Sequence, residues 1–75
     1  MPHLIVHCAK GRSPELKKEI AEKMKAAIID AMGVGPERVS VAFREIEKDG
    51  VAKLYHEVIY ANPEELVIEP GYTVD

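Results

Sequence analysis

The feature that most constrains the fold is a long amphipathic segment between two short apolar runs. Throughout this segment apolar residues recur at spacings of three and four, which places them along one face of a helix. Ser13 before Pro14 is a typical start for such a helix, and Gly33 suits its left-handed end. The pattern therefore predicts a helix over residues 14–32. Its apolar stripe consists of Leu16, Ile20, Met24, Ala27, Ile28 and Ala31.

The two flanking runs have the composition of β-strands. Residues 3–8 are apolar on both faces, as in a strand of a parallel sheet, and residues 39–46 form a second candidate strand. A strand, a crossover helix and a second strand make a β-α-β unit with a parallel strand pair. We therefore predict an α/β fold, a small and mainly parallel sheet in a single domain of residues 1–75. Because two strands make a poor sheet, we expect a second subunit to complete it.

The segment after the second strand carries weaker patterns. Residues 48–50 form a predicted turn, and residues 51–60 fit a short helix followed by a strand. The sequence Asn-Pro-Glu-Glu at 62–65 is typical of another capped helix start. Residues 72–75 are expected to form an arm.

The small size of the chain predicts association between copies. A chain of 75 residues buries a modest share of its unfolded surface and usually needs a disulfide, a metal or a partner. Cys8 is the only cysteine, which excludes an intrachain disulfide, and no Cys or His group has zinc spacing. His7 and Cys8 point to opposite faces of a strand, so we predict no metal site there. A homo-oligomer is therefore expected.

Charge and hydropathy exclude two classes of partner. The net charge of −3 argues against a nucleic-acid binder, which needs a basic face. No apolar run approaches the roughly 20 residues needed to span a membrane. The start of the chain lacks a basic region followed by an apolar stretch, so it does not resemble a signal peptide. We expect a cytoplasmic protein without a nucleic-acid or membrane partner.

Pro2 is the first candidate for chemistry. If Met1 is removed, Pro2 becomes a secondary amine held at the start of a strand. An α-amino group ionises near 7.7–8.0, and nearby positive charge or burial lowers that pKa further. A neutral amine at pH 7 can accept a proton and then return it, which is general acid–base catalysis by one atom. Taken alone, a proline at this position is also unremarkable by composition.

Arg12 is the second candidate, in the sequence Gly-Arg-Ser between the first strand and the helix. A helix N-terminus favours anions, and an arginine beside it can bind a carboxylate through two hydrogen bonds. If Arg12 stood near the start of the first strand across a subunit boundary, the site would combine a base with a carboxylate clamp. By itself, Arg12 also fits a surface residue next to a turn glycine.

These residues, in this order, resemble the 4-oxalocrotonate tautomerase family. The resemblance spans nearly the whole chain and rests on Met1-Pro2, on Gly-Arg-Ser at 11–13 and on the β-α-β order. The C-terminal part, with Tyr55 and Pro-Gly-Tyr at 70–72, is similar to the short enteric branch that acts on phenylpyruvate-type enols. The resemblance implies an isomerase without a cofactor, which interconverts the enol and keto forms of a 2-keto acid.

The resemblance also implies roles for individual residues. Pro2, after loss of Met1, matches the family's catalytic base, and Arg12 matches its substrate-carboxylate arginine. Val51 matches the apolar loop residue that keeps the amine's surroundings dry, although aromatic residues are usual there. Family members are dimers or trimers of dimers, and the tail favours a homodimer over a homohexamer.

Ser40 departs from the pattern of the dicarboxylate-specific members, which have a second arginine at that position. Loss of a bidentate, partly buried ion pair costs on the order of 2–3 kcal/mol, so a second substrate carboxylate would bind poorly. We therefore expect a monocarboxylate such as phenylpyruvate. Arg44 shares a strand face with Ser40 but lies roughly 13 Å away, which favours a surface or interface role for it.

Two other functions stay open at this point. With Met1 retained, Pro2 has no free amine, and the chain becomes a non-catalytic oligomeric binding module with the same fold. A hydratase, dehalogenase or decarboxylase relative would use a protonated proline differently. Such an enzyme needs an additional acidic or aromatic group near the amine, and no residue clearly marks one.

Overall fold

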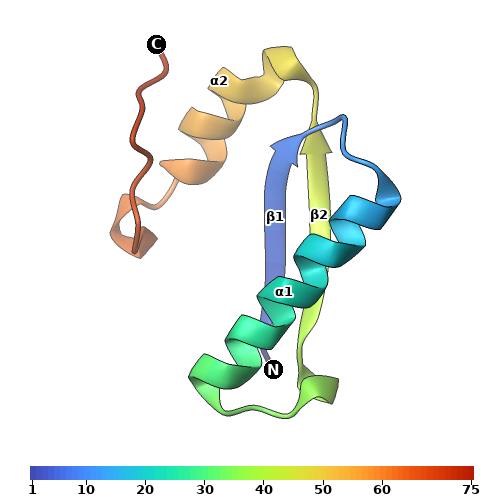
Figure 1. Ribbon diagram of the computed structural model, residues 1–75. Helices are drawn as coiled ribbons and strands as arrows, with labels where there is room; N and C mark the ends of the chain where they lie inside the picture. Colours follow the sequence, from blue (N-terminus) through green and yellow to red (C-terminus); the bar gives the residue numbers. More distant parts are fainter.

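The computed structural model describes residues 1–75 and contains the predicted β-α-β unit (Figure 1). It consists of β1 (His3–Ala9), α1 (Pro14–Met32) and β2 (Ser40–Ile46). The strands are parallel neighbours, as expected from the crossover helix between them. The predicted fold class is therefore confirmed for this part of the chain.

The ends of α1 follow from the local sequence. The Ser13 hydroxyl accepts a hydrogen bond from the backbone N–H of Leu16 at 3.1 Å, which satisfies one of the free donors of the first turn. At the other end, Gly33 has φ of 67°, the left-handed conformation that glycine adopts without strain. Its N–H donates to the carbonyl of Ile29. Both predicted helix boundaries are thus confirmed.

The register of the sheet decides which side chains share a face. Residue pairs run from His3 opposite Ser40 to Ala9 opposite Ile46. Since side chains alternate along a strand, Val41 and its alternate neighbours face one way, and Ser40 and its alternate neighbours face the other. The first face is covered by α1, whose Lys17 forms an ion pair with Glu45 at 2.9 Å.

The chain after β2 differs from the sequence prediction. A 3-10 turn (Lys48–Gly50) leads into α2 (Val51–Leu54), which continues as a π-helical turn over Tyr55–Ile59. The predicted strand in the second half of this segment is wrong. Apolar residues at 51, 54, 55 and 58 recur at helical spacing, and this period outweighs the β-branched composition.

The last segment is also less regular than expected. Residues 62–65 form only a single 3-10 turn, Pro63–Glu65, and the Asn62 side chain makes no capping hydrogen bond. Beyond it the chain is irregular, as the predicted arm requires. The Tyr72 carbonyl accepts a hydrogen bond from the Tyr55 hydroxyl at 3.5 Å, which is a weak contact between the arm and the helix.

A single copy of the chain has almost no closed core. Val39 is the only buried residue, at 7% exposure. The radius of gyration is 14.0 Å, whereas a compact domain of this length has about 11 Å. Figure 1 shows why: the C-terminal segment extends away from the β-α-β unit and leaves one face of the sheet largely uncovered. None of the helices has the length and apolar character needed to cross a bilayer.

Candidate active site

Pro2 and Ser40 lie together at the start of the two strands. The Ser40 N–H donates to the Pro2 carbonyl at 3.2 Å, so the sheet ladder itself places these two residues side by side. The Ser40 hydroxyl and His3 Nδ1 are 2.6 Å apart, in hydrogen-bonding contact. Pro2 is half-buried and is held by this first pair of the sheet.

Arg12 and Val51 lie at the other end of the sheet. Arg12 follows β1, and its Nη1 donates to the Ala9 carbonyl at 3.0 Å. This bond fixes one edge of the guanidinium and leaves its remaining N–H groups for a ligand. Val51 begins α2 just after β2 and is 38% exposed. Both residues therefore stand past the carboxyl ends of the strands.

Arg12 is also a cation at this end of the sheet that has no acidic partner. The neighbouring Lys10 is paired with Glu47 at 2.6 Å, and this hydrogen bond raises the pKa of Lys10. Arg12 forms no ion pair within the chain. Its charge is therefore available for an external carboxylate.

The predicted site residues thus fall into two groups, one at each end of the strands. Seven residues of β1 separate Pro2 from the loop that carries Arg12. At about 3.3 Å per residue, this strand is about 23 Å long. No carboxylate bound by Arg12 reaches the Pro2 nitrogen of the same copy. The structure brings Pro2 to Ser40, but it does not bring either of them to Arg12 or Val51.

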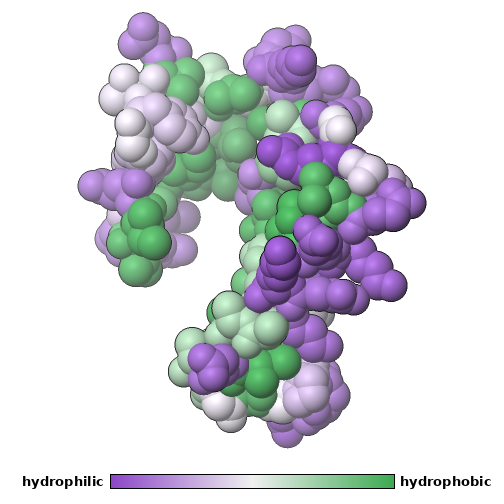
Figure 2. All heavy atoms as spheres, in the orientation of Figure 1, coloured by the Kyte–Doolittle hydropathy of each residue, from purple (hydrophilic) through white to green (hydrophobic).

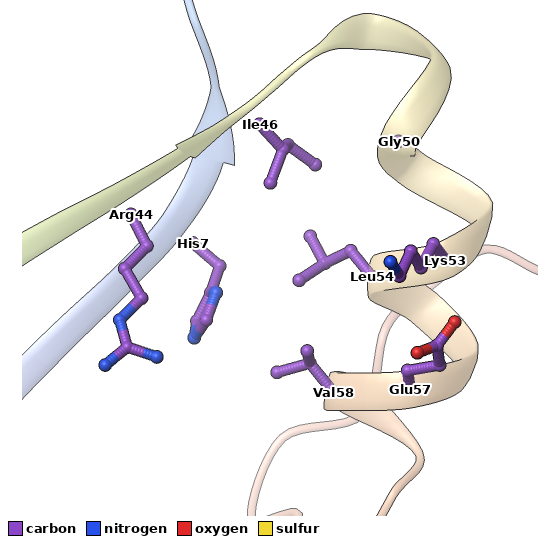
Figure 3. A pocket seen from close by; sticks show the side chains of 8 residues that line it. All are labelled: His7, Arg44, Ile46, Gly50, Lys53, Leu54, Glu57 and Val58. Carbon is purple, nitrogen blue, oxygen red and sulfur yellow. The ribbon is translucent and has the colours of Figure 1, made fainter.

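A groove at the carboxyl end of the sheet was not predicted from the sequence (Figure 3). It encloses about 320 Å³ between the strands on one side and α2 with the π-helical turn on the other. His7, Arg44 and Ile46 project from the strands, and Leu54 and Val58 point toward them from the helix. Gly50, Lys53 and Glu57 complete the lining. In Figure 2 the surface is hollowed between the C-terminal segment and the β-α-β unit, with hydrophobic side chains on the wall.

The signal for this groove was present in the sequence but divided between distant segments. Leu54 and Val58 are four residues apart and share a helical face, whereas residues 51–60 were predicted as a short helix followed by a strand. Arg44 was interpreted as a surface or interface residue. It is exposed and lines the groove, directly opposite His7 in the register.

Comparison with known proteins identifies the family. A sequence profile described as "Tautomerase enzyme" matches residues 2–54. A "Probable tautomerase" of Xylella fastidiosa (strain 9a5c) is 38% identical over 73 residues, which cover 96% of this chain and 89% of that protein. "Tautomerase PptA" of Pectobacterium carotovorum subsp. carotovorum (strain PC1) is 36% identical over 75 residues, covering 97% of this chain and 99% of that protein.

A third relative covers a smaller part of the chain. The "2-hydroxymuconate tautomerase" of Bacillus subtilis (strain 168) is 33% identical over 52 residues, 69% of this chain and 84% of that protein. The chain belongs to the tautomerase family of enzymes, an isomerase class. The resemblance drawn from the sequence, including its similarity to enteric relatives, is thereby confirmed.

Proposed function

We propose that this protein is a tautomerase without a cofactor, which interconverts the enol and keto forms of a 2-keto acid. The relatives support a tautomerase function, and two of them match the chain over nearly its whole length. The observation that carries the proposal is that the candidate site residues lie at opposite ends of the strands. A candidate base with Ser40 lies at one end of the strands, and an unpaired arginine lies at the other.

The proposed site forms between two copies. Two copies with their strands running in opposite directions place Pro2 of one beside Arg12 of the other, and a two-fold axis creates two equivalent sites. The open shape of one copy and its single buried residue support such an assembly. We propose a homodimer, with a homohexamer built from such dimers as the alternative.

The proposed chemistry needs one proton-transfer group and one anion clamp. After removal of Met1, the neutral Pro2 nitrogen takes the proton from the enol hydroxyl while the C2 oxygen becomes a carbonyl. The same nitrogen then delivers a proton to C3, so no proton is gained or lost overall. Arg12 of the other copy holds the carboxylate and stabilises negative charge that develops on the C2 oxygen. Val51 of that copy contributes an apolar wall.

We further propose a monocarboxylate substrate of the phenylpyruvate kind. Ser40 supplies a hydroxyl beside Pro2, and this hydroxyl is already in contact with His3. A hydroxyl so engaged is a poor substitute for a guanidinium that would neutralise a second carboxylate. The 2-hydroxymuconate tautomerase relative makes the dicarboxylate the natural comparison substrate.

The first test combines intact mass with turnover. Mass spectrometry of the purified protein should show loss of Met1, and ketonisation of phenylpyruvate enol should fall at least 100-fold in Pro2→Ala, the scale of a general acid–base contribution. Retained Met1, or equal rates of wild type and Pro2→Ala, would contradict the proposal, and retained Met1 without turnover would indicate a non-catalytic module.

The second test mixes two inactive variants. Pro2→Ala and Arg12→Ala, unfolded together and refolded, should recover about one quarter of wild-type activity, because half the dimers are mixed and each has one intact site. Arg12→Ala mixed with Arg12→Lys serves as the control and should recover nothing beyond its components. No recovery in the first mixture contradicts a site shared between copies.

A further inference from the structure

We propose that the groove between the sheet and α2 binds the non-reacting body of the substrate and selects 2-keto acids with an aryl or bulky apolar group. Leu54 and Val58 are the residues that determine this preference, and Arg44 borders the bound group. The inference rests on the proposed function and concerns the same composite site. In this arrangement one copy supplies Arg12 and the groove, and the other supplies Pro2.

The first argument is the position of the groove relative to Arg12. The Arg12 guanidinium donates to the Ala9 carbonyl at 3.0 Å. Ala9 is paired with Ile46 in the register, and Ile46 lines the groove. The carboxylate clamp and the groove are therefore separated by one pair of strand residues. A substrate held at Arg12 is thus at the same end of the sheet as the groove, whereas Ser40 is at the far end of the strand.

The second argument is the size and the wall of the groove. Its volume of about 320 Å³ is at the lower end of the range for small-molecule pockets, about 300–1,000 Å³. Ile46, Leu54 and Val58 form its apolar part, and Val58 is 45% exposed in one copy. Covering such a side chain with an apolar group releases water and favours binding. A short substrate without this group gains nothing from the groove.

The third argument is the charge at the rim. Arg44 and Lys53 face one acidic residue, Glu57, so the groove is locally cationic in a chain with a net charge of −3. Arg44 takes part in no ion pair of the chain. A guanidinium free of carboxylates can stack on an aromatic ring, and it repels cationic ligands. These properties favour an organic anion with an aromatic body.

The kinetic test uses two enols that differ only in their body. Val58→Asn makes the wall polar without adding charge, at a position exposed enough to tolerate the change. We expect it to raise KM for phenylpyruvate enol about tenfold and to change KM for the enol of pyruvate by less than twofold. Val67→Asn is the matched control, because Val67 is 95% exposed and outside the groove. It should leave both values unchanged.

A second variant examines the rim. Arg44→Gln should raise KM for phenylpyruvate enol about threefold with little change in kcat, since Arg44 contacts only the non-reacting body. An equal loss of kcat for both enols in Val58→Asn or Arg44→Gln contradicts the inference, because a general disturbance of the site affects both substrates alike.

Direct binding separates the inference from the proposed function. Hydrocinnamate and propanoate, which do not react, are titrated into the wild-type protein while the Leu54 and Val58 methyl signals are followed by NMR. Shifts with hydrocinnamate alone support the groove even if the wild type turns over neither enol, in which case only the proposed function fails. No shift with either ligand overturns the inference. Dissociation of the assembly by Val58→Asn in sedimentation experiments also overturns it, because the groove is then an interface between copies.

Discussion

The β-α-β unit and the C-terminal segment differ in how their structure is specified. In the unit, α1 has a side-chain cap at its start and a left-handed glycine after its end, and the strands pair in register over their full length. In the C-terminal segment, none of the short helices has a side-chain cap, and one turn is π-helical. The first region depends on local signals, and the second depends on what it packs against.

This difference matters for function because the two regions meet at the groove. Strand side chains form one wall, and the weakly specified helix forms the other. In our proposal, the regular scaffold holds Pro2 and Arg12, while the irregular segment supplies the surface that contacts the rest of the substrate. Such a division allows the selecting segment to vary without loss of the fold.

The largest effect should come from removing a sheet side chain under α1. Phe43 shares the face of Val41 and is partly buried, and Phe43→Ala should lower the free energy of unfolding by about 2 kcal/mol because it removes apolar surface that is partly covered in the folded state. Val67→Ser in the C-terminal segment is the counterpart and should change it by less than about 0.5 kcal/mol. Urea unfolding at one fixed protein concentration measures the free energy of unfolding of both variants. Equal losses would show that the two regions do not differ.

A smaller effect should come from the caps. Ser13→Ala removes the hydrogen bond to the Leu16 N–H and should cost about 1 kcal/mol. Asn62→Ala is the matched change before Pro63, where no cap bond exists, and it should have no measurable effect. Thermal or urea unfolding of both variants checks the pair. A cost for Asn62→Ala similar to that for Ser13→Ala would contradict local capping as the distinguishing feature.

Two ion pairs provide a finer comparison. Lys17 and Glu45 join α1 to β2 and are each 25% exposed, so a double-mutant cycle should give a coupling of about 0.5–1 kcal/mol. Lys10 and Glu47 are 60% and 68% exposed, and their coupling should be smaller and should vanish at high salt. Double-mutant cycles in which Met replaces each lysine and Gln replaces each glutamate, measured at low and at high salt, test this order. A larger coupling for the exposed pair would contradict it.

The smallest effect concerns Tyr60, which packs against the Tyr55 ring at 4.9 Å between centroids. Partial burial raises the pKa of Tyr60 above its ordinary value of 10.0. The folded state thus keeps a proton that the unfolded chain releases. The contribution of this proton to the free energy of unfolding is fully present below pH 10.0, and it is lost as the pH rises through the raised pKa of Tyr60 in the folded state. In an absorbance titration of the tyrosines at 295 nm, the ionisation step at the highest pH should be absent from Tyr60→Phe. Absence of an earlier step instead would contradict this assignment.

Much of the β-α-β unit could be predicted because its signals lie within a few residues of one another. Ser13, Pro14 and Gly33 mark the ends of α1, and the apolar spacing of the helix is visible without any contact partner. The segment from Val51 to Ile59 was harder, since apolar residues that are both β-branched and helically spaced fit a helix or a strand. Only packing resolves such a choice.

The sequence by itself determined the fold class, the family and the identity of the candidate residues Pro2 and Arg12. The tertiary structure alone decided where these residues lie, because the distance between them depends on the parallel register and on the length of β1. It also created the groove, whose walls come from residues as far apart in the chain as His7 and Val58. Periodicity and caps act over one or two helical turns, whereas a site of this kind depends on contacts between distant segments and, in our proposal, between two copies.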